Sequence, residues 1–190
     1  MNIILMGFRC TGKTSAGRRL AERLELPFYD TDELVERKEK RTIPQIVAKR
    51  GWQTFREMET GVIRDLSGVD CSVIALGGGA VLDVRNVRNL KRGGLFIWLF
   101  AAPETIAARM EKDAAGGAER PSLTGIGSID ETTAVMVERE PFYRRLAQFM
   151  VDTTGIDADQ VAEAIQNGLR KERILISLPE RCVSSKRKGE

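Results

Sequence analysis

The chain has 190 residues, of which 42% are hydrophobic and 30% charged, a composition that fits one globular domain rather than a membrane-spanning or disordered protein. The formal net charge of +3 comes from residues 171–190, because residues 1–170 carry 24 basic and 24 acidic side chains. A neutral body argues against a nucleic-acid partner. The sequence has no histidine, which excludes imidazole bases and histidine-bound metals and leaves carboxylates, lysine, arginine and a hard cation for chemistry.

The chain shows neither an apolar stretch of membrane-spanning length nor the layout of a signal peptide at its N-terminus. We therefore expect a cytoplasmic protein without a membrane partner, and separately we expect it to be a monomer. Residues 1–170 are expected to form one domain, and residues 171–190 a basic tail to which the sequence assigns no role.

The first predicted elements flank a glycine-rich loop. Apolar residues 2–6 predict a buried strand, and residues 14–25 have the spacing of a helix. Between them, Gly7 to Thr14 fit the pattern G-x-x-x-x-G-K-[ST]. Amides at a helix N-terminus bind phosphate, Lys13 can reach the outer phosphates, and the Thr14 hydroxyl can hold Mg²⁺. This segment therefore predicts a cradle for a nucleoside triphosphate.

The rest of the chain alternates short apolar strands with helices. Strands are predicted at 2–6, 27–29, 72–76, 95–100 and 149–152. Helices are predicted at 14–25, 31–40, 43–50, 53–66, 84–91, 103–112, 129–147 and 157–170, with starts marked by Thr42, Asp83 and Asp157. Such an alternation predicts an α/β protein with a mostly parallel sheet covered by helices on two faces. Residues 112–128 are glycine-rich without a clear period, which is typical of a mobile lid or a disordered loop.

A triphosphate cradle is shared by GTPases, motor ATPases and small-molecule kinases. The base-specifying N-K-x-D of GTPases is absent, and the D-x-x-G at residues 65–68 ends a helical segment instead of following a strand. No predicted strand ends in the paired acids of a large ATPase, and the length leaves no room for a second domain. A small-molecule kinase is therefore the leading interpretation.

The second predicted strand runs into the stretch YDTD, which places two carboxylates, Asp30 and Asp32, just after it. The carboxyl ends of parallel strands line the ligand crevice, so both side chains are expected to face the magnesium of the cradle. Asp30 can hold a metal-bound water, and Asp32 can accept the proton of an attacking hydroxyl. A helix N-cap is an equally good interpretation of Asp30, but not of both residues.

Two further stretches are candidates for the acceptor pocket. Arg56 and Glu59 lie three residues apart on one helical face, where the glutamate can orient the guanidinium toward a carboxylate, although such a pair alone is more often a surface salt bridge. The triplet Gly77–Gly79 follows a predicted strand. Three successive glycines are tolerated where a ligand or another backbone must come close.

The stretches GFRCTGKT, YDTD, FREME, LGGGAV, RPSLTG and EREPFYR, in this order, resemble the shikimate kinase family over residues 1–170. The resemblance implies a five-stranded parallel sheet of the P-loop type with a lid at about residues 112–128. It also implies transfer of the γ-phosphate of ATP, with Mg²⁺, to the 3-hydroxyl of shikimate in aromatic amino acid biosynthesis.

The resemblance also implies roles for individual residues. A nucleotide site is implied for Cys10, Thr11, Gly12, Lys13, Thr14, Ser15, Arg109 and the lid residue Arg120. An acceptor site is implied for Asp32, Arg56, Glu59, Gly77, Gly78, Gly79 and Arg139. Asp32 is the implied base, Arg56 and Arg139 hold the acceptor carboxylate, and Lys13 and Arg120 act on the phosphates.

Alternative interpretations stay open at this stage. A kinase of gluconate or of a nucleoside monophosphate shares the cradle and the lid, but gives no reason for two separated arginines and a glycine triplet. A non-catalytic nucleotide-binding module is also compatible, although it is expected to have lost Asp32, Lys13 or Arg120. Arg139 can also be a surface residue paired with a neighbouring glutamate, and Pro141 is expected to kink or break the helix that carries it.

Overall fold

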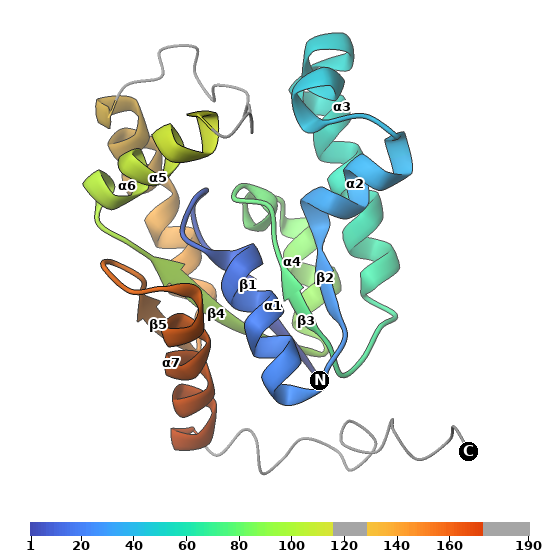
Figure 1. The fold of residues 1–190 in the computed structure, drawn as a ribbon. Helices are drawn as coiled ribbons and strands as arrows, with labels where there is room; N and C mark the ends of the chain where they lie inside the picture. The colour runs from blue at the N-terminus through green and yellow to red at the C-terminus, as the bar shows by residue number, and fades with distance from the viewer. Residues whose placement is uncertain (116–128, 173–190) are drawn as a thin grey trace.

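The computed structural model describes residues 1–115 and 129–172 (Figure 1). Most of the predicted lid, with Arg120, and the predicted tail from residue 173 onward lie outside the described residues. Within the described ranges, five parallel strands form one sheet in the order β2-β3-β1-β4-β5. The strands are β1 (Asn2–Met6), β2 (Phe28–Asp30), β3 (Val73–Ala75), β4 (Gly94–Phe100) and β5 (Phe149–Asp152). The predicted α/β class and parallel sheet are confirmed.

The helices follow the predicted order. They are α1 (Lys13–Leu24), α2 (Thr31–Glu39), α3 (Ile43–Leu66), α4 (Val84–Lys91), α5 (Pro103–Ala115), α6 (Ile129–Leu146) and α7 (Ala158–Lys171), with a short 3₁₀ helix, η1 (Ala80–Leu82), that was not predicted. Gly51, with φ 77° and ψ 166°, interrupts α3 between the two helices predicted there. No helix in the described ranges combines the length and hydropathy that a membrane crossing requires.

Two details differ from the sequence prediction. The helix that carries Arg139 is not broken at Pro141, because α6 continues through this residue to Leu146. Helix α5 runs to Ala115, three residues past its predicted end, since alanine prolongs a helix readily.

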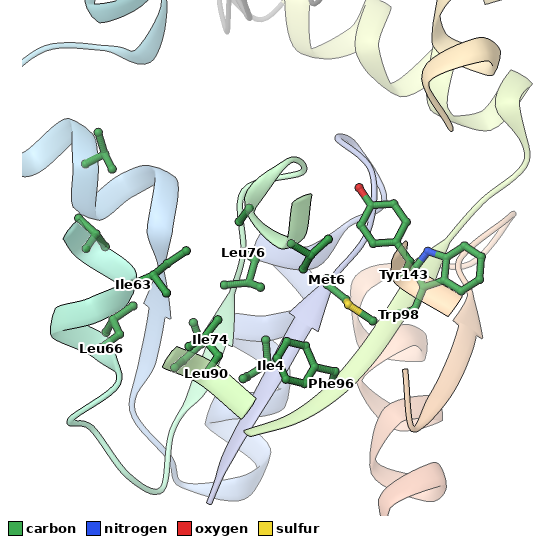
Figure 2. Packing of buried hydrophobic residues seen from close by; sticks show 14 of the residues in the cluster. Ile4, Met6, Ile63, Leu66, Ile74, Leu76, Leu90, Phe96, Trp98 and Tyr143 are labelled. Atoms are coloured by element: carbon green, nitrogen blue, oxygen red, sulfur yellow. The ribbon is translucent and has the colours of Figure 1, made fainter. Parts of the chain in front are cut away.

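The two faces of the sheet pack against different helices. Ile3 and Leu5 of β1 lie in a core cluster with residues of α1 and α7, whereas Ile4 and Met6 point to the opposite face and pack with α3, α4 and α6. Figure 2 shows the second cluster around Ile4 and Met6. Alternate residues of a strand face opposite sides, so β1 is buried on both faces as its apolar run predicts. The result is the three-layer arrangement visible in Figure 1.

Three helix starts carry the side-chain caps that the sequence predicts. The Thr42 hydroxyl accepts a hydrogen bond from the backbone N–H of Gln45, and the Gln45 side-chain oxygen accepts one from the backbone N–H of Thr42. Asp157 forms the same capping box with Gln160. Asp83 accepts from the backbone N–H of Arg85 at the start of α4. These caps define where α3, α4 and α7 begin around the carboxyl edge of the sheet.

Gly94→Ala is expected to destabilise the fold by about 1–3 kcal/mol, because overpacking at a site closed by backbone cannot be relieved by a rotamer change. A Cβ at Gly94 would lie 2.6 Å from the Leu90 carbonyl oxygen and 2.1 Å from Ile4 Cδ1. Gly93→Ala is the matched control, since no heavy atom lies within 4 Å of its added Cβ. Urea unfolding of both variants measures the effect, and equal midpoints would contradict this account of the β1–β4 contact.

Candidate active site

The loop between β1 and α1 forms the predicted cradle at the carboxyl edge of the sheet. Gly7 has φ 146°, and a Cβ there would lie 2.1 Å from the carbonyl oxygen of Leu99 in β4. Gly12, with φ 84°, turns the chain into α1, and the Thr11 hydroxyl donates to the Phe8 carbonyl at 2.8 Å. The loop therefore needs glycine at both ends, for close approach at Gly7 and for a left-handed backbone at Gly12.

Lys13, Thr14 and Asp30 stand at the mouth of this cradle. The Thr14 hydroxyl donates to Asp30 Oδ2 at 2.7 Å, while Asp30 Oδ1 accepts from the backbone N–H groups of Asp32 and Glu33 at 2.9 and 3.3 Å. Asp30 is thus the N-cap of α2 and also contacts the cradle through Thr14, so its role as a cap is compatible with the predicted role at the metal. Lys13 is buried, and its ammonium donates to the Phe8 carbonyl at 2.6 Å.

Arg56 and Glu59 form an ion pair on α3 that is buried at Glu59 and half-buried at Arg56. Arg56 Nη1 lies 2.7 Å from Glu59 Oε2, and Glu59 is only 1% exposed, so the interpretation as a surface salt bridge is wrong. The second oxygen, Glu59 Oε1, is enclosed without a hydrogen-bond partner in the described part of the chain. Burial raises the pKa of Glu59 above its ordinary value, and the Arg56 guanidinium opposes this rise.

The glycine triplet makes room for these side chains. A Cβ at Gly77 would lie 2.4 Å from Glu59 Oε1 and 2.6 Å from Asp32 Oδ1, and a Cβ at Gly79 would lie 2.6 Å from Arg56 Nη2. For a Cβ added at Gly78, the nearest atom would be the backbone nitrogen of Arg9, at 3.2 Å. The carboxylates of Asp32 and Glu59 therefore converge on Gly77, and the predicted close approach involves side chains as well as backbone.

Arg139 reaches the same glycine segment from α6. Its Nη1 donates to the Gly78 carbonyl at 3.2 Å, and its guanidinium carbon lies 5.8 Å from the centre of the Phe8 ring. Glu140 instead pairs with Arg144, at 2.6 Å. Arg139 is therefore directed to the site from a helix that Pro141 does not break.

Arg109 joins the cradle to the segment after β5. Its guanidinium donates to the Cys10 carbonyl at 3.2 Å, to the Thr153 hydroxyl at 3.1 Å and to the Thr153 carbonyl at 2.7 Å. Cys10 has a left-handed backbone, φ 58°, and its thiol lies 3.5 Å from Asp113 Oδ2. Sequence reasoning missed Thr153, although its place just after the last strand was a usable signal.

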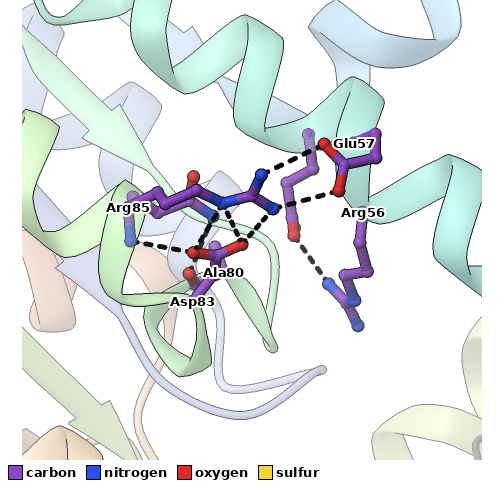
Figure 3. Close-up of polar contacts among 7 residues, drawn as sticks. Arg56, Glu57, Ala80, Asp83 and Arg85 are labelled. Atoms are coloured by element: carbon purple, nitrogen blue, oxygen red, sulfur yellow. Dashed lines mark hydrogen bonds and ion pairs between the residues drawn. The ribbon is translucent and has the colours of Figure 1, made fainter.

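Outside the cavity, a charged network ties α3 to α4. Figure 3 shows Arg85 between Glu57 and Asp83, with N–O distances of 3.0 and 2.7 Å. The Arg85 guanidinium lowers the pKa of Asp83. Asn86 also donates to the Ala80 carbonyl at 2.9 Å, so these contacts hold η1 beside the helix that carries Arg56.

One cavity of about 1080 Å³ joins the cradle to the acceptor side. It is lined by all the described residues implied for the nucleotide site: Cys10, Thr11, Gly12, Lys13, Thr14, Ser15 and Arg109. It is also lined by most of the residues implied for the acceptor: Asp32, Arg56, Glu59, Gly77, Gly78 and Gly79. Trp52 and Phe55 line it too, and their rings lie 5.5 and 5.1 Å from the Arg56 guanidinium carbon. Neither ring was among the site residues that the sequence predicted.

A parallel sheet with this cradle, and with carboxylates and arginines across one cavity from it, defines a P-loop phosphotransferase. Residues 9–170 match the family model for shikimate kinase. The chain belongs to the shikimate kinase family.

Relatives match nearly the whole chain. A shikimate kinase of Syntrophus aciditrophicus (strain SB) is 42% identical over 180 residues, covering 90% of this chain and 92% of the relative. The structure of shikimate kinase from Acinetobacter baumannii in complex with shikimate superimposes with a TM-score of 0.84 at 33% identity, covering 91% of this chain and 94% of that one. Shikimate kinase from Aquifex aeolicus gives a TM-score of 0.75 at 29% identity, covering 92% and 99%.

Glu59 predicts a particular pH dependence of stability. A carboxyl whose pKa is raised by folding keeps its proton to higher pH in the folded chain than in the unfolded chain. Its ionisation therefore destabilises the fold as the pH rises from the ordinary pKa of 4.5 through the folded-state pKa. Across this interval the free energy of unfolding of the wild type should decrease relative to Glu59→Gln. Denaturant unfolding at a series of pH values measures the difference. Glu57→Gln, at an exposed position of the same helix, controls for the lost charge. The assignment would be refuted if the free energy of unfolding of the wild type, relative to that of Glu59→Gln, stayed constant or increased as the pH rises.

Proposed function

We propose that this protein transfers the γ-phosphate of ATP to the 3-hydroxyl of shikimate. The observation that carries the proposal is one cavity with a phosphate cradle at one side and Asp32, Arg56 and the Gly77–Gly79 segment at the other. Membership of the family supports it, as does the similarity to an A. baumannii kinase whose structure contains shikimate. We further propose that the protein is cytoplasmic and monomeric.

On the nucleotide side, the backbone amides of the cradle and the start of α1 supply donors for the phosphates. Lys13 exchanges its bond to the Phe8 carbonyl for the outer phosphates, and Arg120 approaches them from the lid. Thr14 and Asp30 offer a hydroxyl and a carboxylate oxygen 2.7 Å apart, a donor set that fits Mg²⁺, with Asp30 acting through a water. The ion supplies charge neutralisation at the phosphates.

On the acceptor side, Arg56 and Arg139 hold the carboxylate of shikimate and the glycine segment holds its ring. Glu59 fixes the fork of Arg56 through the 2.7 Å ion pair, so little side-chain freedom is lost on binding. Asp32 accepts the proton of the attacking hydroxyl, as phosphoryl transfer to an alcohol requires. Positioning of the two substrates then provides most of the rate enhancement.

The experiment that tests the proposal measures ADP release with ATP and Mg²⁺ in the presence of shikimate, gluconate or nucleoside monophosphates. Release that depends on shikimate alone is expected. Release with another acceptor would redirect the assignment to that kinase class. Nucleotide binding without release under any condition would favour a non-catalytic module.

Asp32→Asn is expected to lower turnover on the order of a hundredfold or more, because the amide cannot accept the proton from the hydroxyl. ATP binding should persist, since the cradle does not use this side chain. Turnover with shikimate and nucleotide affinity by calorimetry measure the two effects. Near wild-type turnover would remove Asp32 from the role of base.

Arg139→Ala is expected to weaken shikimate binding by roughly 2–5 kcal/mol, the cost of breaking a desolvated charge pair. Arg139→Lys should also bind poorly, because an ammonium does not reproduce the fork of the guanidinium. Shikimate and ATP saturation curves test both variants, with Arg145→Ala at an exposed position of α6 as the control. Unchanged shikimate dependence in both Arg139 variants would reject the role and reopen the choice of acceptor.

A further inference from the structure

Two buried hydroxyls hold the Gly77–Gly78 segment at its two ends. The Gly77 N–H donates to the Thr31 hydroxyl at 2.8 Å, and the Gly78 carbonyl accepts from the Tyr143 hydroxyl at 2.5 Å. Thr31 is fully buried and Tyr143 is 2% exposed. Because glycine has no side chain that could pack, hydrogen bonds to the backbone are the means available to fix this segment.

The two hydroxyls come from the helices that carry the acceptor-binding groups. Thr31 opens α2 directly before Asp32, whose carboxylate oxygen would lie 2.6 Å from a Cβ at Gly77. Tyr143 lies one helical turn after Arg139 on α6, and both side chains donate to the same Gly78 carbonyl. The glycine segment therefore connects the helix of the proposed base to the helix of the proposed carboxylate ligand.

The surroundings of both hydroxyls favour a fixed geometry. The Tyr143 ring stacks on Trp98 of β4, with ring centres 5.8 Å apart and an interplanar angle of 25°. Burial raises the pKa of Tyr143 to about 12, so its hydroxyl remains a donor. Thr31 is the first residue of α2 and directly follows the N-cap Asp30, whose carboxylate accepts a hydrogen bond from the Thr14 hydroxyl.

We propose that Thr31 and Tyr143 are positioning residues that set the distance between Asp32 and Arg139 through the Gly77–Gly78 segment. The inference rests on the proposed function, because the separation of these two side chains has to match the hydroxyl and the carboxylate of the acceptor. Neither hydroxyl has to touch the acceptor. Loss of either one lets the segment shift, and so weakens acceptor binding and turnover while leaving the nucleotide cradle intact.

The test removes each hydroxyl at constant shape, with Tyr143→Phe and Thr31→Val in the full chain. A roughly three- to tenfold rise in the KM for shikimate is expected for each, the size of one lost hydrogen bond, together with a lower kcat and an unchanged KM for ATP. Thr31→Ser keeps the hydroxyl and should return the KM for shikimate toward the wild-type value. Tyr29→Phe, at the other tyrosine of the chain, is the matched control and should behave as wild type.

The outcomes separate the two proposals. Wild-type protein that releases no ADP with shikimate overturns the proposed function and this inference together. Active wild type with an unchanged KM for shikimate in both variants overturns the inference alone, as does a lower melting temperature without any change in KM. If Tyr143→Phe does not fold, Thr31→Val and its serine counterpart decide the question.

Discussion

The geometry of the site depends on glycines just after the strand ends, at positions where neighbouring atoms leave no room for a Cβ. At Gly7 the loop after β1 lies so close to the Leu99 carbonyl that no Cβ fits, and at Gly77 the space is taken by the carboxylates of Asp32 and Glu59. Each glycine costs the fold roughly 0.5–1 kcal/mol of chain entropy relative to alanine. Anchors from other side chains offset this cost: Thr11 bonds within the cradle, and Thr31 holds the Gly77 amide. The same contacts that stabilise these segments therefore fix the geometry of the site.

The Arg56–Glu59 pair follows from the same crowding. Burial of a carboxylate is unfavourable unless a partner compensates it, and Arg56 provides a 2.7 Å contact to only one of the two oxygens. The guanidinium lies in turn against the rings of Trp52 and Phe55, which restrict its orientation. The pair and the two rings together fix the direction of Arg56, as its proposed binding to a ligand carboxylate requires.

The sequence predicts the sheet, the cradle and three helix caps because these depend on local patterns of apolar residues, glycine and capping side chains. Contacts between distant segments escape such reasoning: Thr31 and Gly77 are 46 positions apart, and Gly78 and Tyr143 are 65 apart. The burial of Glu59 was missed for the same reason, because the distant segments that enclose it cannot be recognised from the spacing of an i,i+3 pair. Pro141 was predicted to kink or break its helix because a proline has no N–H to bond the carbonyl of the residue four before it. That residue is Val137, which is 64% exposed, and α6 continues through Pro141 to Leu146.

The start of α2 links the two halves of the cavity. Asp30 contacts Thr14 of the cradle, Thr31 holds the glycine segment, and Asp32 faces the acceptor side, all within three consecutive residues. A helix N-terminus is rigid because its own backbone amides bind the cap, here Asp30 Oδ1. Transfer between two bound substrates needs their reacting atoms aligned to within a fraction of an ångström, and it loses rate steeply when they are misplaced. Because the proposed metal-facing carboxylate and the proposed base share one short rigid turn, their separation stays fixed when either substrate is absent.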